Sequence, residues 1–174
     1  VLFRSKVVVL ERLPQLGCES SGPMNNAGTG HAANCELNYT PEAADGSIPT
    51  GKALAINASF ERSLEFWSSL VESQQLSDPA GFIRAVPHLS FVWGQANVDY
   101  LRRRFDALQA APQFADMAWS TDAEQLREWM PLVMAGRRLH QPLAATRVAR
   151  GTDVNFGALT RALLKGVEIG RAHV

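Results

Sequence analysis

The sequence predicts an α/β fold, and three stretches carry that prediction. Residues 6–11 (Lys-Val-Val-Val-Leu-Glu) form an unbroken apolar run that ends in an acid, which is typical of a strand buried on both faces of a parallel sheet. From Lys52 onward, apolar residues recur with a helical period between charged ones, so we expect a long amphipathic helix. Phe82–Trp93 has the composition of strand, with Pro87 marking an edge or a bulge.

Prolines, glycines and polar clusters divide the rest of the chain into shorter elements. The helix from Lys52 should end near Ser73–Gln75, and its aromatic residues Phe60 and Trp67 are expected to pack in the core. We expect four later elements: a helix Asn97–Ala110 with Asn97 as its N-cap, a helix Asp122–Trp129 capped by Ser120 or Thr121 and closed by Pro131, a strand Leu143–Val148, and a helix Asn155–Lys165 capped by Thr152 or Asp153.

Composition excludes several classes of partner. The 174 residues are enough for one domain with a real core, and the 17 basic and 17 acidic residues cancel, so nothing favours nucleic acid as a partner. No apolar run is long enough to span a bilayer, so any membrane contact is expected to be peripheral. Cys18 and Cys35 have neither CxxC spacing nor a histidine pattern for metal. We expect two reduced thiols and no metal site.

Glu11 is the first candidate for ligand binding. In a dinucleotide-binding fold, an acid at the carboxyl end of the second strand accepts hydrogen bonds from ribose hydroxyls, and Glu11 fits that place. The glycine-rich fingerprint of such a fold lies about 20 residues upstream. That position would precede Val1, so the phosphate-binding turn is not in this sequence. A solvated glutamate at a strand end is the alternative.

A small polar loop, Asn25–Pro41, separates the expected first strand from the long helix. Gly28 and Gly30 carry no side chain, so the backbone there is able to approach a ligand closely. Asparagine, threonine and histidine side chains supply donors around these glycines. The alternative is a plain turn, because stretches rich in glycine and asparagine are commonly turns.

Two groups of arginines are open to a functional and a structural interpretation. Arg147 lies in the strand Leu143–Val148, and a guanidinium is able to hold a substrate carboxylate with two parallel bonds. Arg150 and the pair Arg137–Arg138 compete for that role, and each is also an ordinary surface residue. The run Arg102–Arg104 is typical of a solvated helix face; attraction to anionic lipid or a dicarboxylate is the alternative.

Three blocks, in order, resemble the malate:quinone oxidoreductase family. They are the loop 25–41, the stretch 87–94 (PHLSFVWG) and the stretch 151–157 (GTDVNFG), and the similarity runs from about Val7 to Leu164. The resemblance implies an FAD enzyme of the tricarboxylic acid cycle that oxidises malate to oxaloacetate and passes electrons to membrane quinone. It implies a cytoplasmic location, peripheral to the inner face of the membrane.

The resemblance also implies a division of the chain. Residues 6–80 would be a partial FAD-binding, Rossmann-like domain of the flavin oxidase type, and residues 81–150 part of a mixed-sheet substrate domain. Residues 151–167 would return to the FAD domain as a helix. The turn that opens this segment would be mainly structural, with Asp153 and Asn155 fixing the crossover.

Site residues follow from the same resemblance. The implied cofactor-binding residues are Glu11, Arg12, Asn25, Asn26, Ala27, Gly28, Thr29 and Gly30. His31, His88 and Arg147 are the candidates for the catalytic site. His31 would lie near the flavin, where an imidazole is suited to take the proton from a substrate hydroxyl. A hydrogen bond to backbone or to a flavin carbonyl is the alternative for His31, and a satisfied core histidine is the alternative for His88.

The chain is expected to be an internal fragment of a longer enzyme. Val1–Ser5 can be encoded by a short DNA string whose reverse complement, read in another frame, encodes residues 169–173. Chain ends related in this way look like a sequencing adapter translated at both edges of a read. We therefore set residues 1–5 and 168–174 aside as adapter-derived and expect the chain alone to be inactive. Two alternatives stay open: an FAD-dependent 2-hydroxyglutarate dehydrogenase, which shares the Asn–x–Gly–x–x–His spacing, and a non-catalytic remnant.

Overall fold

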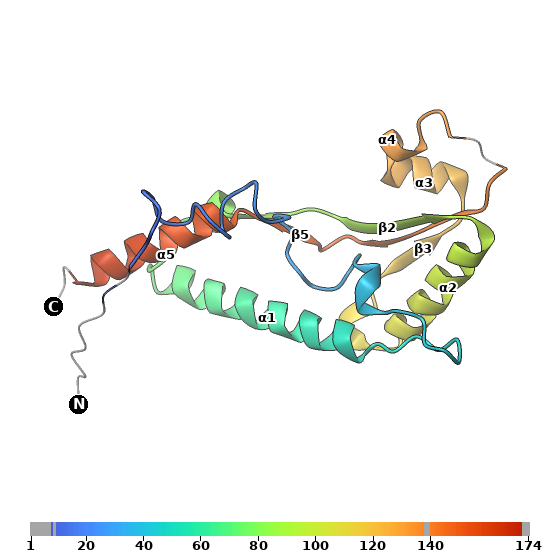
Figure 1. Ribbon diagram of the computed structural model, residues 1–174, viewed down its shortest axis with the longest axis horizontal. Helices are drawn as coiled ribbons and strands as arrows, with labels where there is room; N and C mark the ends of the chain where they lie inside the picture. Colours follow the sequence, from blue (N-terminus) through green and yellow to red (C-terminus); the bar gives the residue numbers. More distant parts are fainter. Residues whose placement is uncertain (1–7, 9, 138–139, 172–174) are drawn as a thin grey trace. The chain divides into compact units, whose positions relative to one another are not determined.

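A computed structural model (Figure 1) describes residues 8, 10–137 and 140–171. The helices are α1 Gly51–Glu72, α2 Gln95–Gln109, α3 Ala123–Trp129, α4 Pro131–Met134 and α5 Phe156–Arg171, with single 3-10 turns η1 Leu37–Tyr39, η2 Pro79–Gly81 and η3 Pro112–Phe114. The strands are β1 Ile83–Ala85, β2 His88–Trp93, β3 Ala118–Ser120, β4 Leu143–Val148 and β5 Thr152–Val154. A mixed α/β fold is therefore confirmed.

The chain forms two compact units. One unit comprises the described residues of 1–28, 69–83 and 154–174, and the other comprises 29–68 and 84–153. The second unit holds the three-stranded antiparallel sheet in the order β2-β4-β3. Strands β1 and β5 pair separately.

The register of β2 and β4 assigns each side chain of the sheet to one face. His88 pairs with Val148 and Ser90 with Thr146, so these four side chains share one face. Leu89 pairs with Arg147, and because side chains alternate along a strand, Arg147 points to the opposite face. This assignment decides which candidate residues are able to meet.

Both faces of the sheet are covered, by different elements. On the His88 face, Val92 and Ala144 pack against Val98 and Leu101 of α2. The opposite face packs against α3 and α4 through an apolar cluster: Leu126, Met130, Met134, Leu143 and Ala145. Figure 1 shows α2 on one side of these strands and α3 with α4 on the other. The sheet is therefore the middle layer of this unit.

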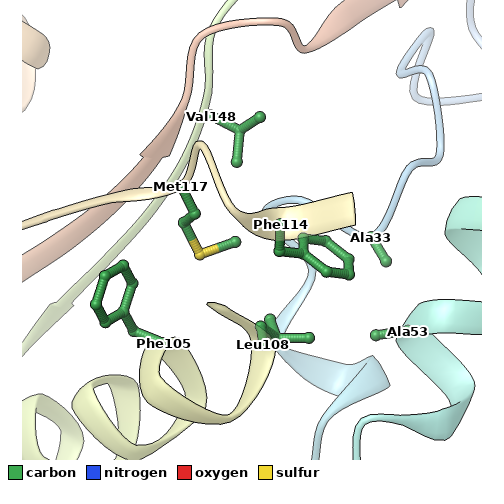
Figure 2. Packing of buried hydrophobic residues seen from close by; sticks show 7 residues of the cluster. All are labelled: Ala33, Ala53, Phe105, Leu108, Phe114, Met117 and Val148. Carbon is green, nitrogen blue, oxygen red and sulfur yellow. The ribbon is translucent and has the colours of Figure 1, made fainter. Parts of the chain in front are cut away.

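A further cluster joins α1 and α2 to the candidate loop. Its buried members are Ala33, Ala53, Phe105, Leu108, Phe114, Met117 and Val148. Figure 2 shows Phe114 and Leu108 facing Ala33 and Ala53, so segments far apart in sequence close over one another here. The fully buried Ala33 lies only two residues after His31.

The long helix and the central strand were predicted closely. Helix α1 ends at Glu72, one residue before the expected range, and its rings Phe60 and Trp67 are half-buried with centroids 6.2 Å apart. Strand β4 has the predicted bounds and lies in the middle of its sheet. The expected strand Phe82–Trp93 is two strands, because the chain breaks at Val86 and Pro87, where Val86 N–H bonds Gly151 O instead.

The expected first strand is not formed in its described part. Lys6, Val7 and Val9 lie outside the described residues; Val8, Leu10 and Glu11 belong to no strand, and Leu10 is 90% exposed. A parallel strand needs a neighbour to hydrogen-bond its backbone, and no strand within 8, 10–137 and 140–171 pairs with this segment.

The N-caps of α2 and α3, and the role of Pro131, differ from the predicted ones. Helix α2 begins at Gln95, and Asn97 is its third residue, whose side chain donates to Trp93 O rather than capping. Asp122 caps α3 by accepting from Gln125 N. Pro131 is the first residue of α4 rather than only the end of α3, as fits a proline with no N–H to satisfy.

Helix α5 is also capped by a different residue and is longer than expected. The side chain of Asn155 accepts from Ala158 N, so Asn155 is the cap rather than Thr152 or Asp153. Thr152 and Asp153 belong to β5 instead. The helix continues beyond Lys165 to Arg171.

Candidate functional site

The loop that carries His31 begins by pairing with β5. Thr29 forms an antiparallel bridge with Asp153, and Gly30 N–H donates to Thr152 O at 2.7 Å. A Cβ on Gly30 would lie 2.6 Å from Phe60 Cζ and closer still to Thr152 Oγ1. Gly30 is therefore required for close packing within the protein. The sequence had suggested instead that its backbone approaches a ligand.

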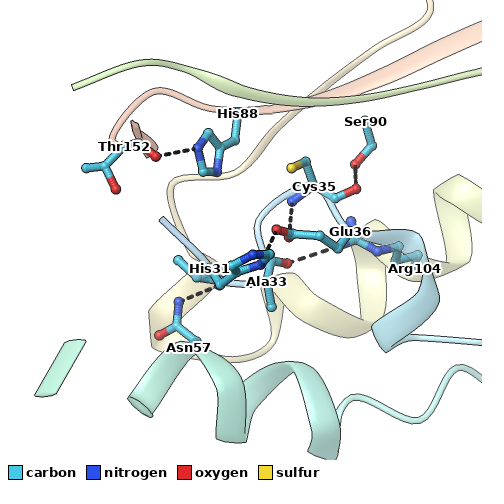
Figure 3. A network of polar contacts seen from close by, with 10 residues as sticks. His31, Ala33, Cys35, Glu36, Asn57, His88, Ser90, Arg104 and Thr152 are labelled. Atoms are coloured by element: carbon cyan, nitrogen blue, oxygen red, sulfur yellow. Dashed lines mark hydrogen bonds and ion pairs between the residues drawn. The ribbon is translucent and has the colours of Figure 1, made fainter. Parts of the chain in front are cut away.

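Downstream of Gly30 the loop is held by side chains from three other elements. These side chains hold five backbone carbonyls: Asn57 donates to Ala32 O (2.9 Å), Arg104 to Ala33 O (3.2 Å), Ser90 to Cys35 O (2.8 Å), and Tyr100 to Leu37 O (3.1 Å) and Thr40 O (2.8 Å). Figure 3 shows several of these contacts around the loop. A loop fixed in this way presents its own side chains in one arrangement.

Arg104 is the buried centre of this support. Its side chain is fully buried, and its Nε donates to Thr40 Oγ1 at 2.9 Å. Burial lowers the pKa of the Arg104 guanidinium, while Tyr100, Cys35 and Glu36 act in the opposite direction. The expected solvated face of Arg102–Arg104 is therefore wrong for Arg104, which points inward, and holds for Arg102 and Arg103, which form exposed ion pairs.

His31 and Glu36 form a pair on this held loop. Nδ1 of His31 lies 3.3 Å from Oε1 of Glu36. The His31 side chain is 50% exposed and that of Glu36 only 17%, so the imidazole lies between the carboxylate and solvent. The other carboxylate oxygen, Oε2, accepts from Cys35 N at 3.3 Å. The arrangement is a half-exposed imidazole held against a mostly buried acid.

The thiol of Cys35 lies in the same partly buried environment as Glu36. Burial, and then the charge of Glu36, raises the pKa of the Cys35 thiol to about 11. Both Cys18 and Cys35 are free. Cys35 is therefore a neutral thiol at physiological pH, and the acid that faces His31 is Glu36.

His88 points from β2 toward the same loop, as Figure 3 shows. It is 6% exposed, and its Nε2 lies 3.1 Å from Thr152 O. The ring packs on Gly151, where a Cβ would overlap the imidazole. Nδ1 is buried and makes no hydrogen bond within the described residues. His88 is thus a core histidine with one ring nitrogen satisfied.

Arg147 lies apart from the two histidines. It is on the sheet face opposite His88, and its guanidinium carbon is 5.9 Å from the ring centroid of Trp129 in α3. Of the competing arginines, Arg150 is tied to Asp116 at 3.0 Å and to Glu61 at 3.3 Å. Arg137 lies over Phe91, and Arg138 is outside the described residues.

The predicted cofactor residues of the first unit make mainly local contacts. Glu11 Oε1 accepts from Leu13 N at 2.9 Å, and Arg12 lies 3.5 Å from Glu19 with 82% of its side chain exposed. Glu11 also borders a cavity of about 500 Å³ that is otherwise lined mainly by the loop 16–21 and by α5.

The side chains of Asn25 and Asn26 form hydrogen bonds with the backbone of nearby residues. Asn25 Nδ2 donates to Glu19 O (2.8 Å), and Asn26 Nδ2 to Ser20 O (3.0 Å) and Gly22 O (2.8 Å). Asn26 Oδ1 accepts from Gly28 N at 2.9 Å. Asn26, Ala27 and Gly28 border a cavity of about 130 Å³ together with residues at the start of α5.

Sequence reasoning missed Glu36 and the side chains that support the loop. Glu36 follows His31 by five residues, and no local sequence pattern predicts that a loop brings these two side chains together. Asn57 carried a usable signal, because it is a polar residue at a buried position of an amphipathic helix.

No helix in the described part of the chain is both long enough and apolar enough to cross a bilayer.

Comparison with known proteins places the chain in a family. The family model for malate:quinone oxidoreductase (Mqo) matches residues 3–173. A protein of Synechococcus sp. (strain RCC307) named "Probable malate:quinone oxidoreductase" is 60% identical over 163 residues, which are 94% of this chain and 34% of that protein. Proteins of the same name from Flavobacterium johnsoniae and Methylobacillus flagellatus are 59% and 55% identical, again over 94% of this chain and 33% of theirs. The chain spans about a third of the length of these relatives, and it belongs to the malate:quinone oxidoreductase family.

Proposed function

We propose that the protein takes part in the FAD-dependent oxidation of malate to oxaloacetate with a quinone as electron acceptor. The observation that carries the proposal is family membership over nearly the whole chain, with relatives up to 60% identical that bear that name. In this reaction malate loses two electrons and two protons, and the quinone gains both to become a quinol. A half-exposed imidazole, that of His31 beside Glu36, supports the proposal as a group able to accept one of those protons.

The first unit offers residues that fit FAD. Glu11 is an exposed carboxylate beside a cavity of about 500 Å³, and a carboxylate accepts hydrogen bonds from ribose hydroxyls. Arg12 is an exposed cation on the next residue and would offer its charge to the phosphates. Together they support an FAD-binding role for this part of the chain.

The loop has a narrower role toward FAD than its glycines suggested. Gly28 N–H and Gly30 N–H both donate within the protein, so these amides do not form an open anion cradle. We propose that Asn25–Gly30 shapes the cofactor site through its backbone path. When bound, FAD supplies the hydride acceptor for the hydroxyl-bearing carbon of malate and the route for electrons to quinone.

His31 is the proposed base. Its side chain is half exposed, so a substrate hydroxyl is able to reach it, whereas His88 is 94% covered. With a proton on Nδ1, which faces Glu36, the Nε2 lone pair would take the hydroxyl proton as hydride leaves the carbon that bears the hydroxyl. His88 is the alternative base, because its Nδ1 has no hydrogen-bond partner in the described part of the chain.

We further propose a cytoplasmic location, peripheral to the inner face of the membrane. A quinone acceptor is dissolved in the lipid, so an enzyme that reduces it must reach the membrane surface. Co-sedimentation with quinone-containing phospholipid vesicles tests this; protein that stays in the supernatant at every lipid concentration contradicts it.

The reaction itself is tested on the protein expressed from its complete gene. We expect malate to support reduction of a short-chain ubiquinone analogue with one oxaloacetate formed per quinol. His31→Gln should lower kcat by about 10²-fold or more, as expected for loss of a general base, and His88→Gln should lower it less. Quinone reduction without oxaloacetate, or turnover only with 2-hydroxyglutarate, overturns the proposal.

A further inference from the structure

We infer that Glu36 is the residue that positions His31 as the base, an inference that rests on the proposed malate oxidation. The juxtaposition is specific to the fold, because Nδ1 of His31 lies 3.3 Å from Oε1 of Glu36 although neither residue is in a helix or strand. No sequence pattern assigns this glutamate a role.

The chemistry of the pair sets the direction of proton transfer. Nδ1 and Oε1 form an ion-pair contact at 3.3 Å, and this buried oxygen has no hydrogen-bond partner within the described residues. Because a carboxylate oxygen only accepts hydrogen bonds, a proton on Nδ1 would satisfy it and would leave the Nε2 lone pair for the substrate. When His31 takes the hydroxyl proton on Nε2, the nearby carboxylate stabilises the imidazolium that forms, because opposite charges attract strongly when partly shielded from water.

Glu36 is itself held in place. Its Oε2 accepts from Cys35 N, and the carbonyl of Cys35 accepts from Ser90 in β2. Cys35 and Arg104 are among the ionisable groups that interact with Glu36. Cys35 is a neutral thiol there, so Glu36 is the acid that faces the imidazole. The acid is therefore fixed in place and close to His31.

The anchored loop keeps the two side chains at this separation. Ala32 and Ala33, between His31 and Glu36 in sequence, have their carbonyls held by Asn57 of α1 and Arg104 of α2. A base and its orienting acid on one braced loop form the minimal arrangement for proton abstraction. Glu36 touches neither substrate nor the reacting carbon in this scheme, so it is a positioning residue.

A double-mutant cycle on the protein from the complete gene tests the inference. Glu36→Gln keeps the size of the side chain and removes its charge. We expect kcat for malate to fall about tenfold or more, within the ~10²–10⁴-fold that base catalysis supplies, while KM changes little. In a His31→Gln background, the same change should leave the remaining rate of flavin reduction unaltered, because Glu36 acts through His31.

Glu42→Gln is the matched control. Glu42 is also a loop glutamate, but it is exposed and pairs with Arg103 on the surface at 2.8 Å, so its variant should keep wild-type kcat. Flavin absorbance and the melting temperature of each variant show that cofactor and fold are retained.

Three results would overturn the inference. They are full activity in Glu36→Gln, an equal loss from that change with and without His31, and full activity in His31→Gln. Each leaves wild-type malate oxidation standing, so none is confused with failure of the proposed function. Failure of the proposed function itself appears separately, as wild-type protein whose flavin malate does not reduce.

Discussion

At the scale of single residues, Ala33 in the loop that carries His31 has a backbone conformation that tertiary packing imposes against its local preference. Ala33 has φ +58°, a conformation that non-glycine residues adopt rarely and at a cost on the order of 1 kcal/mol. It is fully buried, and Arg104 binds its carbonyl. This conformation depends on contacts from α2, about 70 residues away in sequence, so sequence near the loop does not disclose it.

Gly30 offers a direct test of the close packing beneath His31. Gly30→Ala should destabilise the protein by about 1–3 kcal/mol, because the new methyl group overlaps Thr152 and Phe60. Urea denaturation measures the change. Gly51→Ala, at the first residue of α1 with open space around it, is the control and should be neutral or slightly stabilising. Equal stability of the two variants would contradict the packing described here.

Cys35 tests the charge on Glu36. With its pKa raised to about 11, Cys35 has only about one thiolate in a thousand at pH 8, so iodoacetamide should alkylate it far more slowly than the exposed Cys18. Glu36→Gln removes a charge that raises this pKa, so alkylation of Cys35 should become faster. Peptide mass spectrometry of timed samples measures both rates. An unchanged rate at Cys35 would show that Glu36 is not ionised beside it.

At the scale of elements, periodicity predicted the parts whose stability is local. Helix α1 was predicted from its amphipathic stripe, and strand β4 from a short, largely apolar stretch that ends in Val148. The longer β-branched run at residues 6–11 was a weaker guide, because its described part forms no strand. The caps were predicted less well, since several capping residues stand side by side near each helix start. The choice among Thr152, Asp153 and Asn155 depends on the pairing of β5, which is not a local property.

The cap of α5 is therefore a useful element-level test. Asn155→Ala should cost about 0.5–2 kcal/mol, because Ala158 N loses its acceptor, while Asn155→Asp should cost less. Asp153→Ala removes an exposed side chain that does not cap the helix and should change stability little. Thermal or urea unfolding distinguishes the three variants. A larger loss from Asp153→Ala than from Asn155→Ala would restore the sequence-based assignment of the cap.

Arg147 tests the assignment of sheet faces. Because Arg147 packs over Trp129 on the face opposite His88, Arg147→Met should leave the KM for malate unchanged and cost about 0.5–1 kcal/mol of stability. A carboxylate clamp would instead lose its bidentate bonds, and KM would rise tenfold or more. Steady-state kinetics with malate decide between these outcomes.

At the scale of the whole molecule, the three resembling blocks identified the family without supplying the geometry. Residues 29–41 of the first block and the block 87–94 do come together in the second unit, where Ser90 donates to the carbonyl of Cys35. The grouping of His31 with Glu36, and the separation of Arg147 from His88, arise from strand register and loop anchoring over long sequence distances. Such contacts have no signature in a single sequence, which is why family resemblance suggested residues and the fold decided among them.

The most direct test of malate oxidation is anaerobic bleaching of the flavin in the protein purified from its complete gene. Malate should bleach the oxidised flavin absorbance rapidly, 2-hydroxyglutarate should not, and an added quinone should restore it. Bleaching by 2-hydroxyglutarate alone would assign the protein to a different 2-hydroxy acid. The absence of any bound flavin would contradict the proposed FAD-dependent oxidation of malate and would favour a non-catalytic remnant.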